Sequence, residues 1–523
     1  SDGYQTIDRS SADTGLDKRD YLARLSFSSE PASTIYQQLD IKLQYSEEES
    51  QQSYLGLTDA DFSNNGLRRY GASLFDEMQN DHDQVVLTWR LETQTGSGLT
   101  VSAYSNDTSR AWYKTEGVDL DGSENPQSFR RTSWSKVISA VNRGESLDGA
   151  SAGELQAILD GADTPEGSIQ LRNNSREYYS RGIQLVFDSS IRAGSVFHEL
   201  QAGLRYHEDQ EDRLQRNDNY QQLDGQLVLN EPGLEGNAGN RVQDANAWAA
   251  YIYDRIEWDH WVLTPGLRYE NIELSRVRWD TRSEDPASRD PDNYRDSREN
   301  AFDIWLPGIG ALYQLNSSLR LVAGVHRGFA TPTNAPGVEP EESVNYELGL
   351  RHDTSRSSLE AMFFFNDYEN LVGVCTNSSG GDCEPGDAFN GDAVHIPGLE
   401  LTFSYLFDTE SGWELPFQLV YTWMNAEFQS SFVSDYFGQV NKGDPVPYVP
   451  ENQLWASLGL EKNAWSFYFS ANYVGSVCTE ASCGAFEKTE SATIFDLSAH
   501  YRINDRWRLY ALVENLSDEI YVA

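Results

Sequence analysis

Cations are scarce in this sequence. Its 523 residues include 40 Lys and Arg but 82 Asp and Glu, which gives a formal net charge of −42. So large an excess of carboxylates repels phosphate backbones and anionic headgroups, and it therefore excludes a nucleic-acid-binding protein or a basic peripheral membrane protein. A disordered acidic chain is excluded too, because 13 Trp, 28 Tyr and 22 Phe supply apolar surface to bury.

Long apolar runs are also missing. A membrane helix needs about 18 consecutive apolar residues, whereas the longest runs here are short segments such as 248–253 and 361–365. The 17 Pro and 40 Gly are spread along the chain and mark no linker. We therefore expect no membrane helix, and one domain that spans residues 1–523.

The pattern that is present is two-residue alternation in segments of about ten residues. Leu39, Ile41, Leu43 and Tyr45, for example, alternate with polar residues. The same alternation recurs at 85–92, 200–207, 400–407 and 494–501. This pattern predicts an all-β protein whose strands have one apolar and one polar face.

The connections between these segments alternate in length. We count 18 candidate strands, and nine short turns are strictly interleaved with eight long polar loops. The long loops lie near 46–83, 106–176, 207–242, 272–300, 328–343, 371–393, 427–448 and 476–490. All long loops then lie on one rim, which is typical of a transmembrane up-and-down antiparallel β-barrel with short periplasmic turns and long extracellular loops.

Two further features fit this barrel. Aromatic residues such as Trp89, Tyr206, Trp258 and Trp261 lie near predicted strand ends, where membrane barrels carry aromatic girdles, although a soluble core could use the same residues. Within the loop 106–176, residues 134–160 have apolar spacing suited to one or two short helices. We expect these helices to lie over the barrel mouth.

Several segments resemble the barrel of TonB-dependent outer-membrane receptors, and among these the ferric dicitrate receptor group. They occur in the family's order along nearly the whole chain. These segments are YLGLTDADF (54–62), RRYGAS (68–73), HELQAGLRYHEDQEDR (198–213), WVLTPGLRYENIEL (261–274), GFATPTNAPGVEPEESVNYELGLRHD (328–353), HIPGLELTFSY (395–405) and LYALVENLSDEIY (509–521).

The resemblance implies a barrel of 22 strands, an N-terminal plug and a TonB box. Since we count 18 strands, we expect the plug, the first strands and the last strand to be missing from this chain. The implied function is uptake of a ferric chelate, ferric citrate or a related siderophore, into the periplasm of a Gram-negative bacterium. The implied partners are that chelate, TonB with ExbB and ExbD acting through the plug, and outer-membrane lipid. We expect a monomer.

Arginines near predicted external strand ends are candidate ligand-binding residues. A ferric chelate such as dicitrate is anionic, and arginine binds carboxylates bidentately. Salt bridges within the loops are the alternative reading of the same residues. The candidates are Arg68, Arg69, Arg176 and Arg327, with Asn334 as a polar contact.

Four other arginines occupy the polar positions of their strands and should face the lumen, with a structural role: Arg90, Arg205, Arg268 and Arg351. The same residue facing lipid would cost about 2 to 4 kcal/mol at the membrane midplane.

The four cysteines form two close pairs, each within one predicted external loop. An exported compartment favours disulfides between Cys375 and Cys383 and between Cys478 and Cys483. Neither pair has the spacing of a zinc site. The acidic loops match no EF-hand, so we expect no metal site and no cofactor, with iron only as part of the transported chelate.

No motif of an enzyme is present, since the sequence contains neither GxSxG nor HExxH, and neither a P-loop nor a Rossmann fingerprint. Two alternatives to ferric chelate uptake stay open. One is the same fold transporting a vitamin, a sugar or another metallophore. The other is a secreted acidic β-protein that acts as a lectin or a hydrolase.

Overall fold

The computed structural model describes residues 3, 5–12, 14–120, 131–332, 334, 336–374, 388–390, 393–434, 437–484 and 486–521. Eighteen strands of this part pair with one another in chain order. They are β2 (Leu16–Ser28), β3 (Ile35–Ser50), β5 (Glu77–Thr93), β6 (Ser97–Val118), β9 (Arg176–Ala193), β10 (Val196–Leu223), β12 (Gly239–Trp258), β13 (Trp261–Trp279), β14 (Tyr294–Gln314), β15 (Leu319–Ala330), β16 (Glu341–Asp353), β17 (Ser357–Glu369), β20 (Val394–Asp408), β21 (Glu414–Met424), β25 (Asn452–Lys462), β26 (Trp465–Val474), β27 (Ala492–Arg502) and β28 (Arg508–Val513).

The remaining elements lie in connections. The short strands are β1 (Thr6–Ile7), β4 (Arg68–Arg69), β7 (Thr132–Ser133), β8 (Ile169–Asn173), β11 (Gln226–Glu231), β18 (Val372–Val374), β19 (Ala388–Asn390), β22 (Glu427–Phe428), β23 (Phe432–Ser434) and β24 (Gly438–Val440). The helices are α1 (Asp59–Asn64), α2 (Trp134–Arg143) and α3 (Ala152–Leu159), with 3₁₀ turns at Gly71–Ser73 and Pro291–Asn293.

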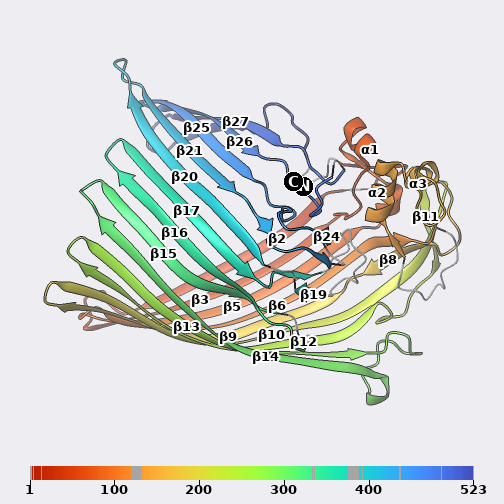
Figure 1. The fold of residues 1–523 in the computed structure, drawn as a ribbon, viewed down its shortest axis with the longest axis horizontal. Helices are drawn as coiled ribbons and strands as arrows, with labels where there is room; N and C mark the ends of the chain where they lie inside the picture. Colours follow the sequence, from red (N-terminus) through yellow and green to blue (C-terminus); the bar gives the residue numbers. More distant parts are fainter. Residues whose placement is uncertain are drawn as a thin grey trace.

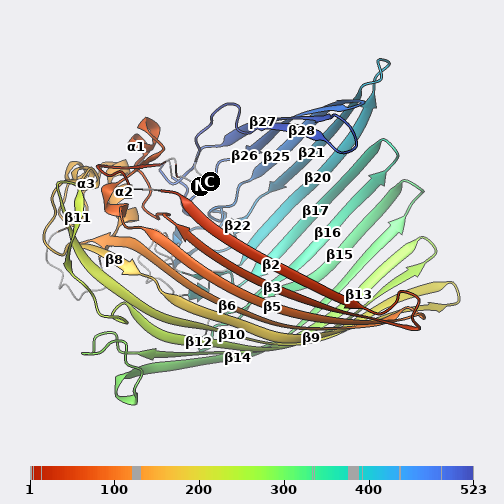
Figure 2. The ribbon, with the colours of Figure 1, turned by 180° about the vertical axis from the view of Figure 1, so that it is seen from behind.

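The strands form one antiparallel barrel sheet, in which each strand pairs with the next along the chain. Figure 1 shows the strands in rainbow order around the barrel, and Figure 2 shows β2, β3, β5 and β6 side by side from behind. The up-and-down barrel predicted from the sequence is confirmed. The predicted parity of the connections also holds, because the short turns gather at one rim and the long loops at the other.

The two faces of the sheet differ as the alternation predicts. Large apolar side chains lie exposed on the outer face, among them Ile252 at 49% and Leu348 at 63%. On β12, Trp248 and Trp258 are both outward and ten residues apart. That spacing is roughly 33 Å along the strand, or about 25 Å across a membrane at a tilt of about 40°, which matches the apolar band of an outer-membrane barrel.

The strands next to the large loops are longer than the sequence predicts. β6 continues to Val118 and β10 to Leu223, through residues that we expected to be loop. Beyond the apolar band both faces of a strand are polar, so the alternation disappears while the backbone ladder continues. The wall of the barrel therefore rises well above the aromatic residues.

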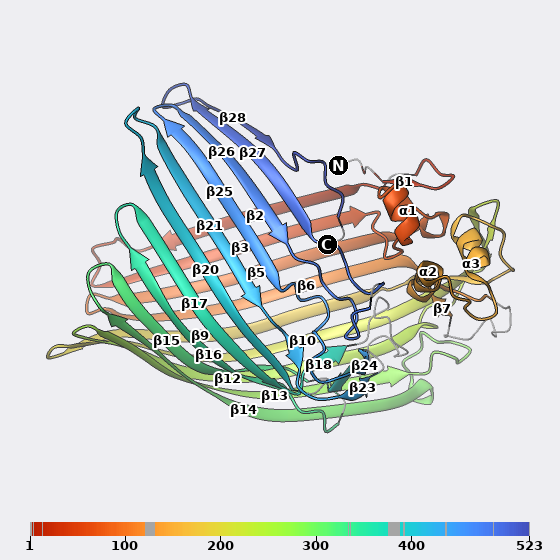
Figure 3. The ribbon, with the colours of Figure 1, turned by 45° about the horizontal axis from the view of Figure 1, so that its top comes forward.

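A helical cap lies at the rim of the long loops, as Figure 3 shows for α1, α2 and α3. Of the one or two short helices expected within 134–160, two are present, α2 and α3. Ser133 Oγ accepts a hydrogen bond from Lys136 N at the start of α2, and Gly144, with φ of 70°, ends it. Ser151 and Glu154 form a capping box on α3.

Segments from three loops pack together to form the core of this cap. The contributing side chains come from residues 55–72, 118–171 and 220–227 and include the buried Tyr70, Val137, Leu155 and Ile169. No helix in the part of the chain described is long and apolar enough to cross a membrane.

One of the two expected disulfides is present in the structure. Cys478 and Cys483 are bonded to each other within the loop between β26 and β27. Cys375 and Cys383 lie outside the described residues.

Candidate functional site

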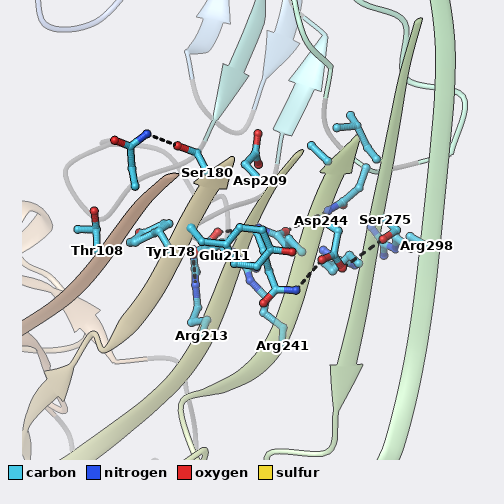
Figure 4. Close-up of a pocket in the computed structure, with 18 of the residues that line it drawn as sticks. Thr108, Tyr178, Ser180, Asp209, Glu211, Arg213, Arg241, Asp244, Ser275 and Arg298 are labelled. Atoms are coloured by element: carbon cyan, nitrogen blue, oxygen red, sulfur yellow. Dashed lines mark hydrogen bonds and ion pairs between the residues drawn. The ribbon is translucent and has the colours of Figure 1, made fainter. Parts of the chain in front are cut away.

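A cavity of about 680 Å³ opens along the wall formed by β6, β9, β10, β12, β13 and β14, at the long-loop end. Figure 4 shows its side chains converging from these neighbouring strands. Small side chains such as Ser180 and Ala245 leave the space, and longer polar ones surround it. The lining includes Asn106, Thr108, Tyr178, Ser180, Asp209, Glu211, Arg213, Arg241, Gln243, Ala245, Leu274, Arg276, Arg298, Pro332 and Asn334.

The upper edge of this wall is a row of arginines. Five arginines lie on five neighbouring strands, and each is the register partner of the next. They are Arg110 on β6, Arg176 on β9, Arg213 on β10, Arg241 on β12 and Arg278 on β13. Arg276 and Arg298 form a second opposed pair on β13 and β14. The strand parity places them on the face opposite the exposed apolar side chains, which is the lumen. Like charges directly opposite one another destabilise a sheet unless anions compensate them.

Two carboxylates compensate part of this charge. Glu211 lies 3.3 Å from Arg176 and 2.5 Å from Arg213, and Asp296 lies 2.5 Å from Arg278. Burial raises the pKa of Glu211, but the two arginines lower it more, so the pKa of this carboxyl falls below its usual range. Glu211 is therefore ionised near neutral pH.

Arg241 is the fourth arginine of the row, between Arg213 and Arg278. Among the described residues no carboxylate lies within ion-pair distance of its guanidinium, and its buried Nε has no hydrogen-bond partner. Burial, followed by the neighbouring Arg213, lowers its pKa to about 9. Arg241 stays protonated near neutral pH, and its charge is available to an anion in the cavity.

Of the residues predicted from the sequence, Asn334 lines this cavity and Arg176 stands beside it, opposite the lining residue Arg213. Asn334, between β15 and β16, lines it and donates a hydrogen bond from Nδ2 to Gln243 Oε1 at 3.0 Å. Arg176 belongs to the arginine row and also donates to Asn174 Oδ1 at 3.0 Å and to Tyr178 Oη at 3.2 Å. Their role in ligand binding stays a prediction.

The structure places the other two predicted arginines of the first loop in the cap. Arg68 pairs with Asp8, Asp61 and Asp160 at 2.8, 2.5 and 2.6 Å, and hydrogen bonding to Asp8 raises its pKa. Arg69 is 3% exposed and donates to the carbonyl oxygens of Gln51 and Ser73. Both side chains hold loop segments together.

Arg327 faces away from the cavity. It shares strand parity with Leu321, which is 42% exposed on the outer face. Its guanidinium pairs with Glu342 of β16, which lies two residues before Val344, the register partner of Arg327. The structure therefore does not bring Arg327 together with Arg176 and Asn334.

The four arginines expected in the lumen all lie on the inner face by strand parity. Three of them pair with a carboxylate of the same or the next strand: Arg90 with Glu92, Arg268 with Glu270 and Arg351 with Glu360. The fourth, Arg205, bonds to Tyr104 and His207 instead.

Sequence reasoning missed most of the arginine row, namely Arg110, Arg213, Arg241, Arg276, Arg278 and Arg298. These residues fall in segments that were expected to be loop, or at the margin of one. A signal was present, because polar and apolar residues alternate in both segments. Arg276 and Arg278 flank Val277, and Arg241 and Gln243 flank Val242. Two-residue alternation of charge indicates that a strand continues beyond its apolar part.

Among the described residues, no group of three or more His, Cys, Asp or Glu side chains is placed to hold a metal ion. Four guanidinium groups and three carboxylates, those of Asp209, Glu211 and Asp244, line the cavity together with amide and hydroxyl groups. The guanidinium, amide N–H and hydroxyl groups can donate to anionic oxygens.

Comparison with known proteins assigns the family. Residues 2–516 match the family described as "TonB dependent receptor-like, beta-barrel". The metal-pseudopaline receptor CntO of Pseudomonas aeruginosa is 24% identical over 410 residues, which are 74% of this chain and 54% of that protein. The vitamin B12 transporter BtuB of Photobacterium profundum is 22% identical over 226 residues, 41% of this chain and 34% of that protein. The chain thus spans about half or less of the length of these relatives.

Solved structures share the fold. The ferric citrate transporter FecA in its unliganded form matches 96% of this chain and 66% of its own, with a TM-score of 0.69 and 17% identity. The siderophore receptor PiuA of Acinetobacter baumannii matches 100% of this chain and 72% of its own, with a TM-score of 0.67 and 14% identity. The family match over residues 2–516 excludes the secreted lectin or hydrolase. The chain belongs to the TonB-dependent receptor β-barrel family, whose members are outer-membrane receptors and transporters rather than enzymes.

Proposed function

We propose that this protein takes up an anionic ferric chelate, ferric citrate or a related carboxylate siderophore, across the outer membrane. The observation that carries the proposal is the row of opposed arginines along the lumen cavity, in a chain with twice as many acidic as basic residues. Guanidinium groups bind carboxylates through paired, charge-assisted hydrogen bonds. In this proposal TonB, with ExbB and ExbD, supplies the energy for transport.

The cavity has the dimensions and the chemistry for such a ligand. Its volume lies within the range of small-molecule sites. Arg241 offers an uncompensated charge, and Arg213, Arg276 and Arg298 surround it. Asn334 and Tyr178 add neutral polar contacts. A neutral chelate would leave the Arg241 charge unpaired, which disfavours it as the substrate.

A second candidate substrate is another metallophore that carries carboxylates. The similarity to the metal-pseudopaline receptor, over 74% of this chain, favours it over a sugar or a vitamin without anionic groups. The two candidates differ in the metal and the chelator but require the same arginines.

The test measures binding and uptake of radiolabelled iron by the full-length protein, in cells that lack other receptors for ferric citrate and siderophores. We expect uptake with ferric citrate and none with a neutral ferric hydroxamate. Arg213→Gln and Arg241→Gln should each weaken binding roughly tenfold or more, since each removes a charged hydrogen-bond partner.

The matched control is Arg351→Gln, on another part of the lumen wall, where Glu360 already pairs with the arginine at 2.9 Å. Its binding should equal that of the wild type. Equal binding by the two cavity variants and the wild type would contradict the assigned site. Uptake of the neutral hydroxamate alone would contradict the substrate class.

A further inference from the structure

Arg205 differs from Arg90, Arg268 and Arg351, the three other arginines expected to have a structural role in the lumen, in the charge of its partners. The guanidinium groups of Arg90, Arg268 and Arg351 each lie within 4.0 Å of a carboxylate. In the part of the chain that the structure describes, Arg205 makes no such ion pair. Its hydrogen bonds go to Tyr104 and His207.

Tyr104 fixes one edge of the Arg205 guanidinium. Nε and Nη2 of Arg205 donate to Tyr104 Oη at 3.1 and 2.8 Å, and Cζ lies 5.7 Å from the centre of the tyrosine ring. These bonds use the Nε and Nη2 edge. Because an arginine has five N–H donors in a rigid fork, the Nη1 end remains able to bind an acceptor in the lumen.

The partners of Arg205 are neutral by the direction of their hydrogen bonds. His207 Nε2 lies 3.1 Å from Asp209 Oδ2. An ionised carboxylate can only accept, so Nε2 carries a proton. Arg205 Nη2, which can only donate, lies 3.2 Å from Nδ1, so Nδ1 is an acceptor and the Tyr104 hydroxyl at 2.6 Å donates to it. Tyr104 then donates to His207 and accepts from Arg205. Neither residue cancels the arginine charge.

A glycine makes room for this arrangement. Tyr104 on β6, Gly182 on β9 and His207 on β10 occupy one register row across three strands. A Cβ at position 182 would lie 2.4 Å from Tyr104 Oη. The ring of Tyr104 can therefore cross β9 only because residue 182 is a glycine. In this way a side chain of β6 reaches across β9 and holds Arg205 on β10.

The Arg205 group lies directly below the arginine-lined cavity on the same inner face. Asp209 lines the cavity and bonds to His207. Arg205 and Arg213 share β10 and its lumen parity, eight residues apart. That separation is roughly 26 Å along the strand at about 3.3 Å per residue. An anion released from the cavity toward the periplasm would meet Arg205 next on this strand.

We propose that Arg205, held by Tyr104 and His207, is a second anion-binding position in the lumen, which receives a carboxylate of the chelate during its passage. The inference rests on the proposed uptake of an anionic chelate and adds a step to it. The cavity would bind the chelate at the external side, and Arg205 would lower the barrier for its movement along the wall. The sequence alone assigned Arg205 a structural role.

The first test needs neither iron nor transport. The purified full-length protein is treated with phenylglyoxal, which modifies accessible arginines, with and without free citrate, and modification is mapped by mass spectrometry. We expect Arg205 to react without citrate and to be protected by citrate. Arg268, which Glu270 already neutralises at 2.5 Å, should show no citrate effect. An Arg205 that is unreactive without citrate, or reactive to the same extent with it, would overturn the proposal.

The second test separates passage from external binding. Arg205→Gln should leave the affinity for ferric citrate at the cell surface unchanged and lower the maximal uptake rate roughly tenfold. Arg268→Gln is the matched control, since Arg268 also lies against a tyrosine ring, at 5.8 Å from that of Tyr251. An unchanged rate with Arg205→Gln would overturn the step. Absence of ferric citrate uptake in the wild type would instead contradict the proposed function, while citrate protection of Arg205 would still be measurable.

Discussion

Among single residues, Asp76 shows how burial changes the behaviour of a charge. It lies just before β5, at the base of the cap, and is 1% exposed. Ser53 Oγ and Thr115 N donate to its two carboxyl oxygens at 2.6 and 2.7 Å. Burial raises its pKa to about 7, although these hydrogen bonds act in the opposite direction. Asp76 thus links the first loop to β6 through a carboxyl that titrates near neutral pH.

The pH dependence of cap stability follows from this pKa. Because the pKa in the folded protein exceeds that in the unfolded chain, the contribution of Asp76 is fully present below about pH 4 and is lost as the pH rises through about 7. We expect the cap to lose hydrogen-exchange protection over that range. Asp76→Asn should remove this dependence, whereas Glu166→Gln, at an exposed position, should preserve it. A dependence unchanged in Asp76→Asn would contradict the assignment.

The arginines show that residue type alone does not define a role. Arg69 is buried against backbone carbonyls, Arg68 joins three aspartates, and Arg241 has no carboxylate within ion-pair distance among the described residues. All three are arginines of loop or strand-end segments. Their partners, which come from distant parts of the sequence, decide which of them can bind a ligand.

Among local elements, α3 has an N-terminal cap that the sequence predicts, but the stability of the helix comes from its surroundings. Its capping box is visible in the sequence as Ser151 followed by Glu154. With eight residues it is too short to be stable alone. Leu155 and Leu159, both fully buried, attach it to the core of the cap.

A pair of substitutions in α3 tests this dependence. Leu155→Ala should destabilise the cap by about 2 to 5 kcal/mol, because it removes a buried side chain and leaves a cavity. Gly153→Ala, two residues before Leu155 and with open space around it, should stabilise the helix by up to about 1 kcal/mol. Amide hydrogen exchange of α2 and α3 measures both. Equal protection in the two variants would show that the cap does not depend on its core.

For the barrel as a whole, the alternation of the strands separates lipid from lumen. Leu87 and Thr88 are consecutive on β5 and lie on opposite faces. Leu87 is 42% exposed toward the outside, and Thr88 stands opposite Asp40 in the lumen. The two positions share their backbone environment and differ only in the solvent that they meet.

Arginine at each position should therefore have different effects. Leu87→Arg places a charge in the apolar band and should cost about 2 to 4 kcal/mol, while Thr88→Arg should cost little, because the lumen is polar and Asp40 is near. The folded fraction in outer membranes, measured by heat-modifiable migration on a gel, reports the difference. Equal folded fractions would contradict the assigned faces.

The sequence was sufficient to predict the barrel, its 18 strands, the rim of the long loops and a helical segment within 134–160 that forms α2 and α3. These features follow from local patterns. A strand between lipid and lumen must alternate apolar and polar residues, and the capping residues of a helix lie next to it in the sequence. The upper ends of the strands could not be predicted, because the alternation fades where both faces are polar. As a result, most of the arginines at the cavity were assigned to loops.

The proposed binding site depends on strand register, which no local pattern contains. Arg176, Arg213 and Arg241 are far apart in the chain, and only the pairing of β9, β10 and β12 places them opposite one another. Register likewise brings Tyr104 across Gly182 to Arg205, and it turns Arg327 outward. The alternation predicts that a strand has a lumen face. Pairing with the neighbouring strands decides which charges meet on that face, because a register shift of one residue exchanges the two faces of a strand.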